Sequence, residues 1–70
     1  MGKFIIEINL GNSALPDETK ADIDIAADEI SRILSECKDK LERGYASWPI
    51  RDINGNIVGR AGFVTNEYFK

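Results

Sequence analysis

The strongest constraint on the fold is a run of apolar residues at helical spacing between Thr19 and Gly44. Intervals of three and four residues place these side chains on one face of an amphipathic α-helix. The stripe consists of Ile23, Ala26, Ala27, Ile30, Ile33, Leu34, Cys37 and Leu41. In a chain of only 70 residues, the segments on either side must cover this stripe.

Both ends of the predicted helix carry recognisable signals. Thr19 followed three residues later by Asp22 is a capping-box pattern, and Asp22 also lies near the positive end of the helix dipole. Gly44 is expected to end the helix, because glycine readily adopts the left-handed conformation that closes one. We therefore predict a helix over residues 19–43.

The opposite helix face is charged, with acids and bases one turn apart in pairs that support a helix. The expected pairs are Asp28/Arg32, Glu36/Lys40 and Asp39/Arg43. Ile25 interrupts this charged face. Two interpretations stay open: a single surface isoleucine, or a hydrophobic anchor within an acidic partner-binding surface. The candidate residues of that surface are Asp24, Ile25, Asp28, Asp39 and Glu42.

The segment at residues 3–10 alternates as a strand with one buried face does. The residues expected to face the helix are Phe4, Ile6, Ile8 and Leu10, and Leu15 is expected to pack beneath the amino end of the helix. Residues 45–64 are predicted to form a hairpin, because Asn54-Gly55 is a strong signal for a tight turn. A two-residue turn would pair Asp52 with Ile57, Ile50 with Gly59, Trp48 with Ala61 and Ala46 with Phe63.

The order strand, helix, strand, strand predicts an α+β fold of one domain spanning residues 1–70. Pro49 cannot donate to a sheet ladder, so its strand belongs at an edge. The third strand then lies in the middle of a three-stranded mixed sheet of order 1-3-2, antiparallel to both neighbours. We expect a two-layer β-α-β-β sandwich with the helix on one face, and a tail at residues 65–70 that belongs to no element.

The residue types argue against an enzyme. The chain has no histidine and one cysteine, Cys37, whose place on the apolar stripe indicates a packed thiol rather than a reactive one. Asp52, Asn54 and Asn56 have the spacing that opens a calcium loop, but Ile57 and Phe63 stand where that loop needs glycine and glutamate. Hairpin turn chemistry explains the same residues. We expect no catalytic residues, no metal and no cofactor.

Charge and hydropathy limit the partners. With a net charge of −3 and a pI near 4.8, the chain lacks the excess of basic residues that phosphate backbones require, so direct nucleic-acid binding is not expected. An acidic protein can still bind the basic groove of another protein. The amino-terminal residues have no apolar run long enough for a signal peptide or a membrane span, so we expect a cytoplasmic protein and no membrane partner.

The sheet face away from the helix is the second candidate for partner binding. One helix covers one face only, and the other is expected to carry Ile5, Tyr45, Val58 and Arg60. This face is more apolar than a solvated surface requires, which often marks an interaction site. The sheet edges are also available for pairing with another chain. A homodimer and a foreign partner are equally compatible with these features.

Two segments resemble those of a known group of proteins: residues 4–12, FIIEINLGN, and residues 50–59, IRDINGNIVG. The chain is similar to small acidic proteins encoded by bacteriophages, prophages and other mobile elements. These share an amino-terminal EI..GN strand, a capped helix and an RD-NGN-VG hairpin. The resemblance extends to Val64 and implies a setting inside a bacterial cell, without identifying a functional residue.

Small acidic proteins in that setting include inhibitors of host defence, among them anti-CRISPR proteins that occupy a surface of a nuclease complex. The resemblance therefore favours a non-enzymatic inhibitor that binds a host protein or protein complex. The alternative hypothesis is a structural or accessory protein that associates with itself through the open sheet face.

Overall fold

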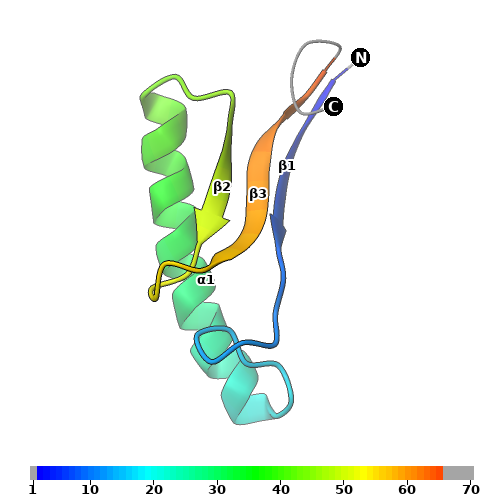
Figure 1. Ribbon diagram of the computed structural model, residues 1–70, viewed down its shortest axis with the longest axis vertical. Helices are drawn as coiled ribbons and strands as arrows, with labels where there is room; N and C mark the ends of the chain where they lie inside the picture. The colour runs from blue at the N-terminus through cyan, green and yellow to red at the C-terminus, as the bar shows by residue number, and fades with distance from the viewer. Residues whose placement is uncertain (1, 66–70) are drawn as a thin grey trace.

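A computed structural model describes residues 2–65 of the chain. Its elements are β1 (Lys3–Ile8), α1 (Lys20–Glu42), β2 (Ser47–Arg51) and β3 (Ile57–Val64). Figure 1 shows α1 on one side of the three strands, with the helix nearest to β2 and farthest from β1. The predicted two-layer α+β fold is therefore confirmed. Beyond Thr65, the predicted tail lies outside the described residues.

The sheet has the predicted order β1-β3-β2. Both hydrogen-bonded ladders are antiparallel, so β1 and β2 run in the same direction at the two edges without being neighbours. The sheet is therefore antiparallel throughout rather than mixed. Pro49 lies in the edge strand β2, as expected for a residue without a backbone N–H.

The ends of α1 follow the sequence signals. The hydroxyl of Thr19 accepts a hydrogen bond from the Asp22 N–H at 3.0 Å, and the Asp22 carboxylate accepts one from the Thr19 N–H at 3.2 Å. Gly44, with φ 86°, follows the carboxyl-terminal cap Arg43 in the left-handed conformation. Residues 19 and 43 are therefore caps, and the helical residues lie between them.

The core is small. Its buried apolar residues are Leu15, Ala26, Ile33, Cys37, Trp48, Ile50, Val58 and Ala61. The burial of Leu15 confirms that the connection between β1 and α1 packs into the core. Burial of Trp48 and Ile50 likewise confirms the core side of β2, and buried Cys37 is a packed thiol.

The hairpin differs from the prediction at its turn. The Asp52 N–H donates to the Asn56 carbonyl at 2.9 Å and the Gly55 N–H donates to the Asp52 carbonyl at 3.0 Å. With Gly55 at φ 86°, this is a three-residue loop rather than the predicted two-residue turn. Arg51, not Asp52, therefore pairs with Ile57, although Ile50 still pairs with Gly59 and Trp48 with Ala61.

The change of register leaves Val58 as an extra residue in β3. A bulge of this kind breaks the strict alternation of faces. Val58 is consequently buried, with 6% of its surface exposed, whereas the preceding Ile57 is 61% exposed. The assignment of Val58 to the open sheet face was wrong, because it assumed an unbroken alternation.

The helix is also rotated relative to its apolar stripe. Its buried residues are Ala26, Glu29, Ile33 and Cys37. At about 100° per residue, the centre of this buried face lies roughly 60° from the centre of the predicted stripe, towards Glu29. Ile23, Leu34 and Leu41 keep 44%, 46% and 40% of their surface exposed. Their predicted burial was wrong because α1 covers only part of the sheet.

The β1 side of the sheet is incompletely covered for the same reason. Phe4 pairs with Phe63 and Ile6 with Ala61, which places both β1 side chains on the face that carries α1, as predicted. The Phe4 ring contacts Phe63 at a centroid distance of 5.0 Å. Phe4 and Ile6 nevertheless remain 36% and 38% exposed, and Leu10 is 43% exposed. The two layers are closed over β2 and open over β1.

Adjacent substitutions in β3 test the bulge. We expect Val58→Thr to lower the free energy of unfolding by about 1–3 kcal/mol, because it buries a hydroxyl in the core. Ile57→Thr, at an exposed position, should change it by less than about 0.5 kcal/mol. Urea denaturation followed by circular dichroism measures both. The reverse order of the two effects would show that β3 alternates regularly and has no bulge.

Candidate functional site

Two carboxylates are buried where α1 meets the hairpin. Glu29 and Asp52 keep only 8% and 4% of their surface exposed, although acidic residues are rarely buried without partners. No buried side-chain nitrogen or oxygen among residues 2–65 lacks a hydrogen-bond partner. The partners of these two carboxylates therefore show how the hairpin is held.

Glu29 attaches the hairpin loop to the helix. Its Oε2 accepts a hydrogen bond from the Ile53 N–H at 2.7 Å, and its Oε1 accepts one from Arg32 Nε at 2.6 Å. Arg32 Nη2 also donates to the Arg51 carbonyl at 3.3 Å. One ion pair on α1 thus holds backbone groups on both sides of Asp52.

Asp52 organises the loop from within. Its carboxylate accepts hydrogen bonds from the backbone N–H groups of Asn54 and Asn56, each at 2.9 Å. The side-chain amides of Asn56 and Asn12 donate to the same carboxylate at 3.1 and 2.9 Å. The groups around Asp52 are N–H donors, whereas calcium is coordinated by oxygen atoms. The acid-x-Asn-x-Asn spacing is thus accounted for by turn chemistry.

Asn12 connects this loop to the start of the core. Besides donating to Asp52, its side-chain oxygen accepts hydrogen bonds from the N–H groups of Ala14 and Leu15, at 3.0 and 2.8 Å. Leu15 is fully buried. The loop before α1, the hairpin loop and the helix therefore meet at one polar cluster, which we call the hairpin clamp: Asn12, Glu29, Arg32 and Asp52.

The clamp shifts the acidity of both carboxylates. The hydrogen bond from Arg32 outweighs the opposing effect of burial and, with the Ile53 N–H, holds the pKa of Glu29 below its ordinary 4.5. Burial alone would raise the pKa of Asp52, but the hydrogen bonds from Asn56, Asn54 and Asn12 hold it below its ordinary 3.8. Both groups are consequently ionised in the folded protein at neutral pH.

The clamp places an exposed isoleucine beside the charged face of the helix. Ile53 follows Asp52 and is 70% exposed, while its N–H is held by Glu29. Ile25 lies one helical turn before Glu29 on the same side of α1 and is 53% exposed, as the sequence predicted. Asp24 and Asp28 border it and are exposed. We call these four residues, Asp24, Ile25, Asp28 and Ile53, the hairpin–helix surface.

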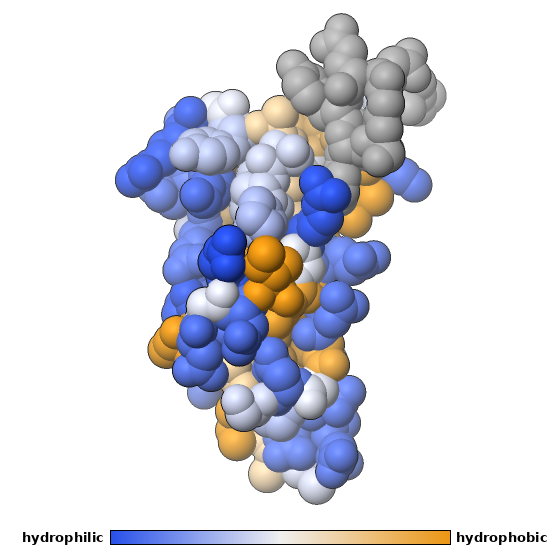
Figure 2. All heavy atoms as spheres, viewed as in Figure 1, coloured by the Kyte–Doolittle hydropathy of each residue, from blue (hydrophilic) through white to orange (hydrophobic). Residues whose placement is uncertain are grey.

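Seen from the side of β2 and the hairpin, the molecular surface is mostly hydrophilic, with small hydrophobic areas among the polar side chains (Figure 2). This is the arrangement of a hydrophobic contact with a polar rim.

Ile53 was not singled out in the sequence. The available signal was an isoleucine inside a turn, where glycine, asparagine, aspartate or serine is more usual.

The acidic helix face is a long row rather than one cluster. Asp24 and Asp28 lie near the hairpin, whereas Asp39 and Glu42 lie near the end of the helix, so the two groups are separated by about 16–27 Å of helix rise at 1.5 Å per residue. Three of the four acids have intrahelical partners: Lys20–Asp24, Lys38–Glu42 and Arg43–Asp39. The row is therefore partly neutralised.

Two of the three predicted helix pairs were wrong. Arg32 pairs with Glu29 and Glu36 instead of Asp28, because the clamp turns its guanidinium towards the hairpin. Lys40 does not pair with Glu36 and lies 4.5 Å from the centre of the Tyr45 ring. The Asp39/Arg43 pair is confirmed at 3.2 Å.

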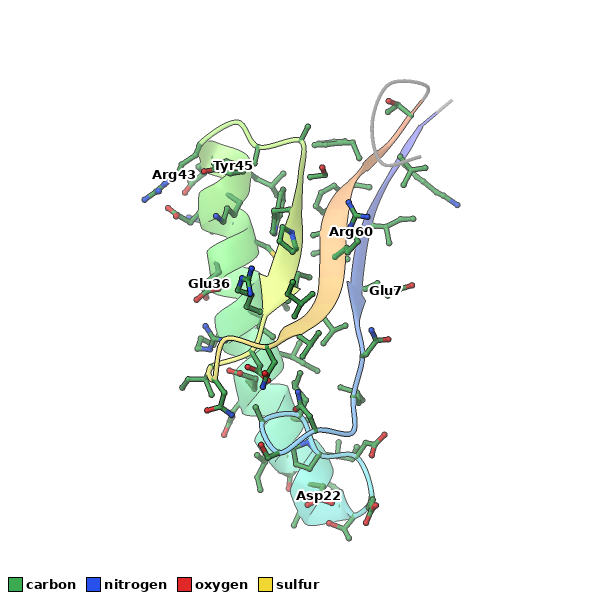
Figure 3. The ribbon with its side chains drawn as sticks, viewed as in Figure 1. Glu7, Asp22, Glu36, Arg43, Tyr45 and Arg60 are labelled. Carbon is green, nitrogen blue, oxygen red and sulfur yellow. The ribbon has the colours of Figure 1, made fainter. Side chains whose placement is uncertain are left out.

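The candidates on the open sheet face do not form one surface. Arg60 pairs with Glu7 and with Pro49, so it lies on that face, and Figure 3 shows Glu7 and Arg60 on neighbouring strands. Ile5 shares this face but is only half-buried. Tyr45 instead lies beside Arg43 at the end of α1, beneath Lys40, and Val58 is in the core. The open-face assignment of Tyr45 was wrong because the residue precedes β2.

A shallow groove of about 280 Å³ lies between α1 and β2. Its walls combine apolar and charged side chains: Ile33, Glu36, Cys37, Lys40, Tyr45, Ser47, Trp48, Pro49, Ile50 and Arg51. The volume is at the lower limit for a small-molecule site. Cys37, one of its lining residues, has no imidazole beside it, and residues 2–65 contain no cluster of three metal-binding side chains.

No protein-family model, curated protein or solved structure matches this chain. Within residues 2–65, no helix has an apolar stretch long enough to cross a bilayer.

The clamp predicts how stability depends on pH. Both carboxylates have a lower pKa in the folded than in the unfolded chain. Their contribution to the free energy of unfolding is therefore present at neutral pH and is lost as the pH falls below about 4.5. We expect Glu29→Gln to lower the midpoint of thermal unfolding at pH 7, with the difference from the original chain shrinking towards about pH 2. Asp28→Asn, at an exposed position, is the control. A difference for Glu29→Gln that is constant with pH would contradict the role of its charge.

Proposed function

We propose that this chain is a non-enzymatic protein-binding module of a phage or other mobile element, which binds through the hairpin–helix surface. The observation that carries the proposal is Ile53, an isoleucine that is 70% exposed although its backbone N–H is held by the buried carboxylate of Glu29. An exposed apolar side chain on a rigid support is typical of an anchor residue at an interface.

Preorganisation is the physical reason that this surface suits binding. Ordering a flexible loop on association reduces affinity, whereas a loop already held by its own hydrogen bonds avoids that loss. Asp52 accepts four hydrogen bonds, three from the hairpin loop and one from Asn12, and Glu29 holds the N–H of Ile53. The loop is therefore set in one conformation before a partner arrives.

The charges around the anchors indicate the kind of partner. Asp28, next to Ile25, has no ion pair among residues 2–65, whereas Asp24 is paired with Lys20. A complementary surface would therefore have an apolar recess with a basic group facing Asp28. Proteins that bind nucleic acid have such basic surfaces. An inhibitor of a host nuclease complex fits this description, and the resemblance of residues 4–12 and 50–59 to phage and prophage proteins supports a bacterial cytoplasm as the setting.

Self-association is the second candidate. The structure gives it less support on the open sheet face, because Val58 and Tyr45 do not lie there. The edge of β1 is a better candidate for self-association than the open sheet face.

The test is affinity capture of the tagged chain from a bacterial lysate, with identification of the retained proteins. We expect a defence nuclease or one of its subunits to be captured, with affinity falling roughly tenfold for Ile53→Ala and for Ile25→Ala, since loss of an anchor costs more than about 1 kcal/mol. Ile57→Ala is the matched control, because Ile57 is 61% exposed, a value between those of Ile25 and Ile53, and is paired with Arg51 outside the hairpin–helix surface.

Salt and activity make the test specific. Affinity that weakens with ionic strength and with Asp28→Lys would support a basic partner surface. The captured nuclease should lose activity when the chain is added. Capture that is equal for Ile53→Ala, Ile25→Ala and Ile57→Ala would show that the hairpin–helix surface is not the contact.

A further inference from the structure

The edge of β1 has backbone groups available for pairing. The Asn9 N–H donates to the Val58 carbonyl at 2.7 Å, which sets the phase of the β1–β3 ladder. In an antiparallel strand, the backbone groups of alternate residues point to the same side. Glu7, Ile5 and Lys3 therefore bond to β3, as Asn9 does. The N–H and C=O groups of Phe4, Ile6 and Ile8 consequently point away from the sheet.

The opposite edge, formed by β2, offers fewer backbone groups for pairing. The Phe63 N–H donates to the Ala46 carbonyl at 2.9 Å, so Ser47, Pro49 and Arg51 direct their backbone groups outward. Pro49 has no N–H to offer, and the Arg51 carbonyl already accepts a hydrogen bond from Arg32. Proline and covering side chains are the usual protection of an edge strand. β1 contains neither proline nor a bulge.

Exposed apolar side chains border the open edge. Phe4, Ile6 and Phe63 lie on the α1 side of β1 and β3 and are 36%, 38% and 39% exposed. Ile23, Leu34 and Leu41 are exposed on the side of α1 opposite Glu29, and Glu29 faces the hairpin next to β2. Both sets therefore face the β1 side. Six of the eleven large apolar residues that are exposed within residues 2–65 therefore lie on this side, which is short of a covering partner.

We infer that two copies of this chain pair β1 with β1, antiparallel and centred on Ile5, to form one continuous six-stranded sheet. In this register Phe4 of each copy lies opposite Ile6 of the other, so residues with outward backbone groups meet as hydrogen-bonded pairs. The two α1 helices then lie on the same face of the joined sheet.

Charge complementarity selects this register and this partner. Pairing about Ile5 places Lys3 of each copy opposite Glu7 of the other copy, on the face away from α1. Shifting the centre to Ile6 places Ile5 opposite Glu7 instead, and a centre at Glu7 brings the two Glu7 side chains together. β1 is thus complementary to itself in one register. On the helix side, two Phe4–Ile6 pairs cover each other's exposed surface.

The inference develops the second candidate, self-association, and is independent of the proposed binding of a host protein, because the two contacts use different residues. The hairpin–helix surface lies beside β2, and the pairing edge is β1, at the other side of the sheet. A dimer formed in this way leaves Ile25 and Ile53 of both copies exposed.

The charges of β1 provide the decisive experiment. Sedimentation of the full chain over a range of concentrations should show a monomer–dimer equilibrium. Lys3→Glu and Glu7→Lys each replace two attractive cross-strand pairs with repulsive ones, so each should weaken the dimer roughly tenfold. Mixing the two variants restores opposite charges at both positions, and a heterodimer should form. Glu18→Lys, an exposed charge reversal outside β1, is the control and should dimerise normally.

A backbone variant gives a second measurement. Ile6→Pro removes an N–H that does not bond to β3, so it should give a folded monomer by circular dichroism and sedimentation. A chain that is monomeric at all concentrations would overturn the inference. So would a dimer that Lys3→Glu and Glu7→Lys leave unchanged, or variants that fail to recombine. Failed capture of a host protein by a chain that still dimerises would reject the proposed function alone.

Discussion

The rotation of α1 about its own axis depends on the carboxylate of Glu29. This side chain would be solvated on an ordinary amphipathic helix, but it accepts the Ile53 N–H and the Arg32 guanidinium and is buried. A buried carboxylate is stable only while its partners stay in place, since leaving a charge unpaired costs several kcal/mol, typically about 3–5. The helix therefore lies towards β2 and the hairpin rather than over the middle of the sheet.

That rotation leaves the two sides of the molecule physically different. On the β2 side, hydrogen bonds hold the hairpin loop and present Ile53 on a fixed backbone. On the β1 side, the remaining part of the apolar stripe has no sheet beneath it, and Phe4 and Ile6 have no helix above them. Both proposed contact surfaces thus depend on one buried carboxylate, that of Glu29. On the closed side it holds the loop that presents Ile53, and on the open side the rotated helix leaves the β1 edge uncovered.

Features governed by local interactions were predictable from the sequence. Thr19, Asp22 and Gly44 set the ends of the helix because capping involves groups only a few residues apart. Pro49 assigned β2 to an edge and so determined the strand order. Within the candidate site, the exposure of Ile25 and of its neighbouring acids followed from helical periodicity alone. The exposure of Ile53 was not predictable in this way, because it depends on the conformation of the hairpin loop.

The sequence by itself determined the elements, their order and most of the core, because hydrophobic period, caps and turn residues act over short distances. Only the tertiary structure decided how the elements meet. The bulge that buries Val58, the rotation that exposes Leu34, and the pairing of Arg32 with Glu29 all depend on contacts between segments distant in the chain. A periodic pattern predicts that a helix has an apolar face, but the elements that pack against the helix decide how much of that face is covered.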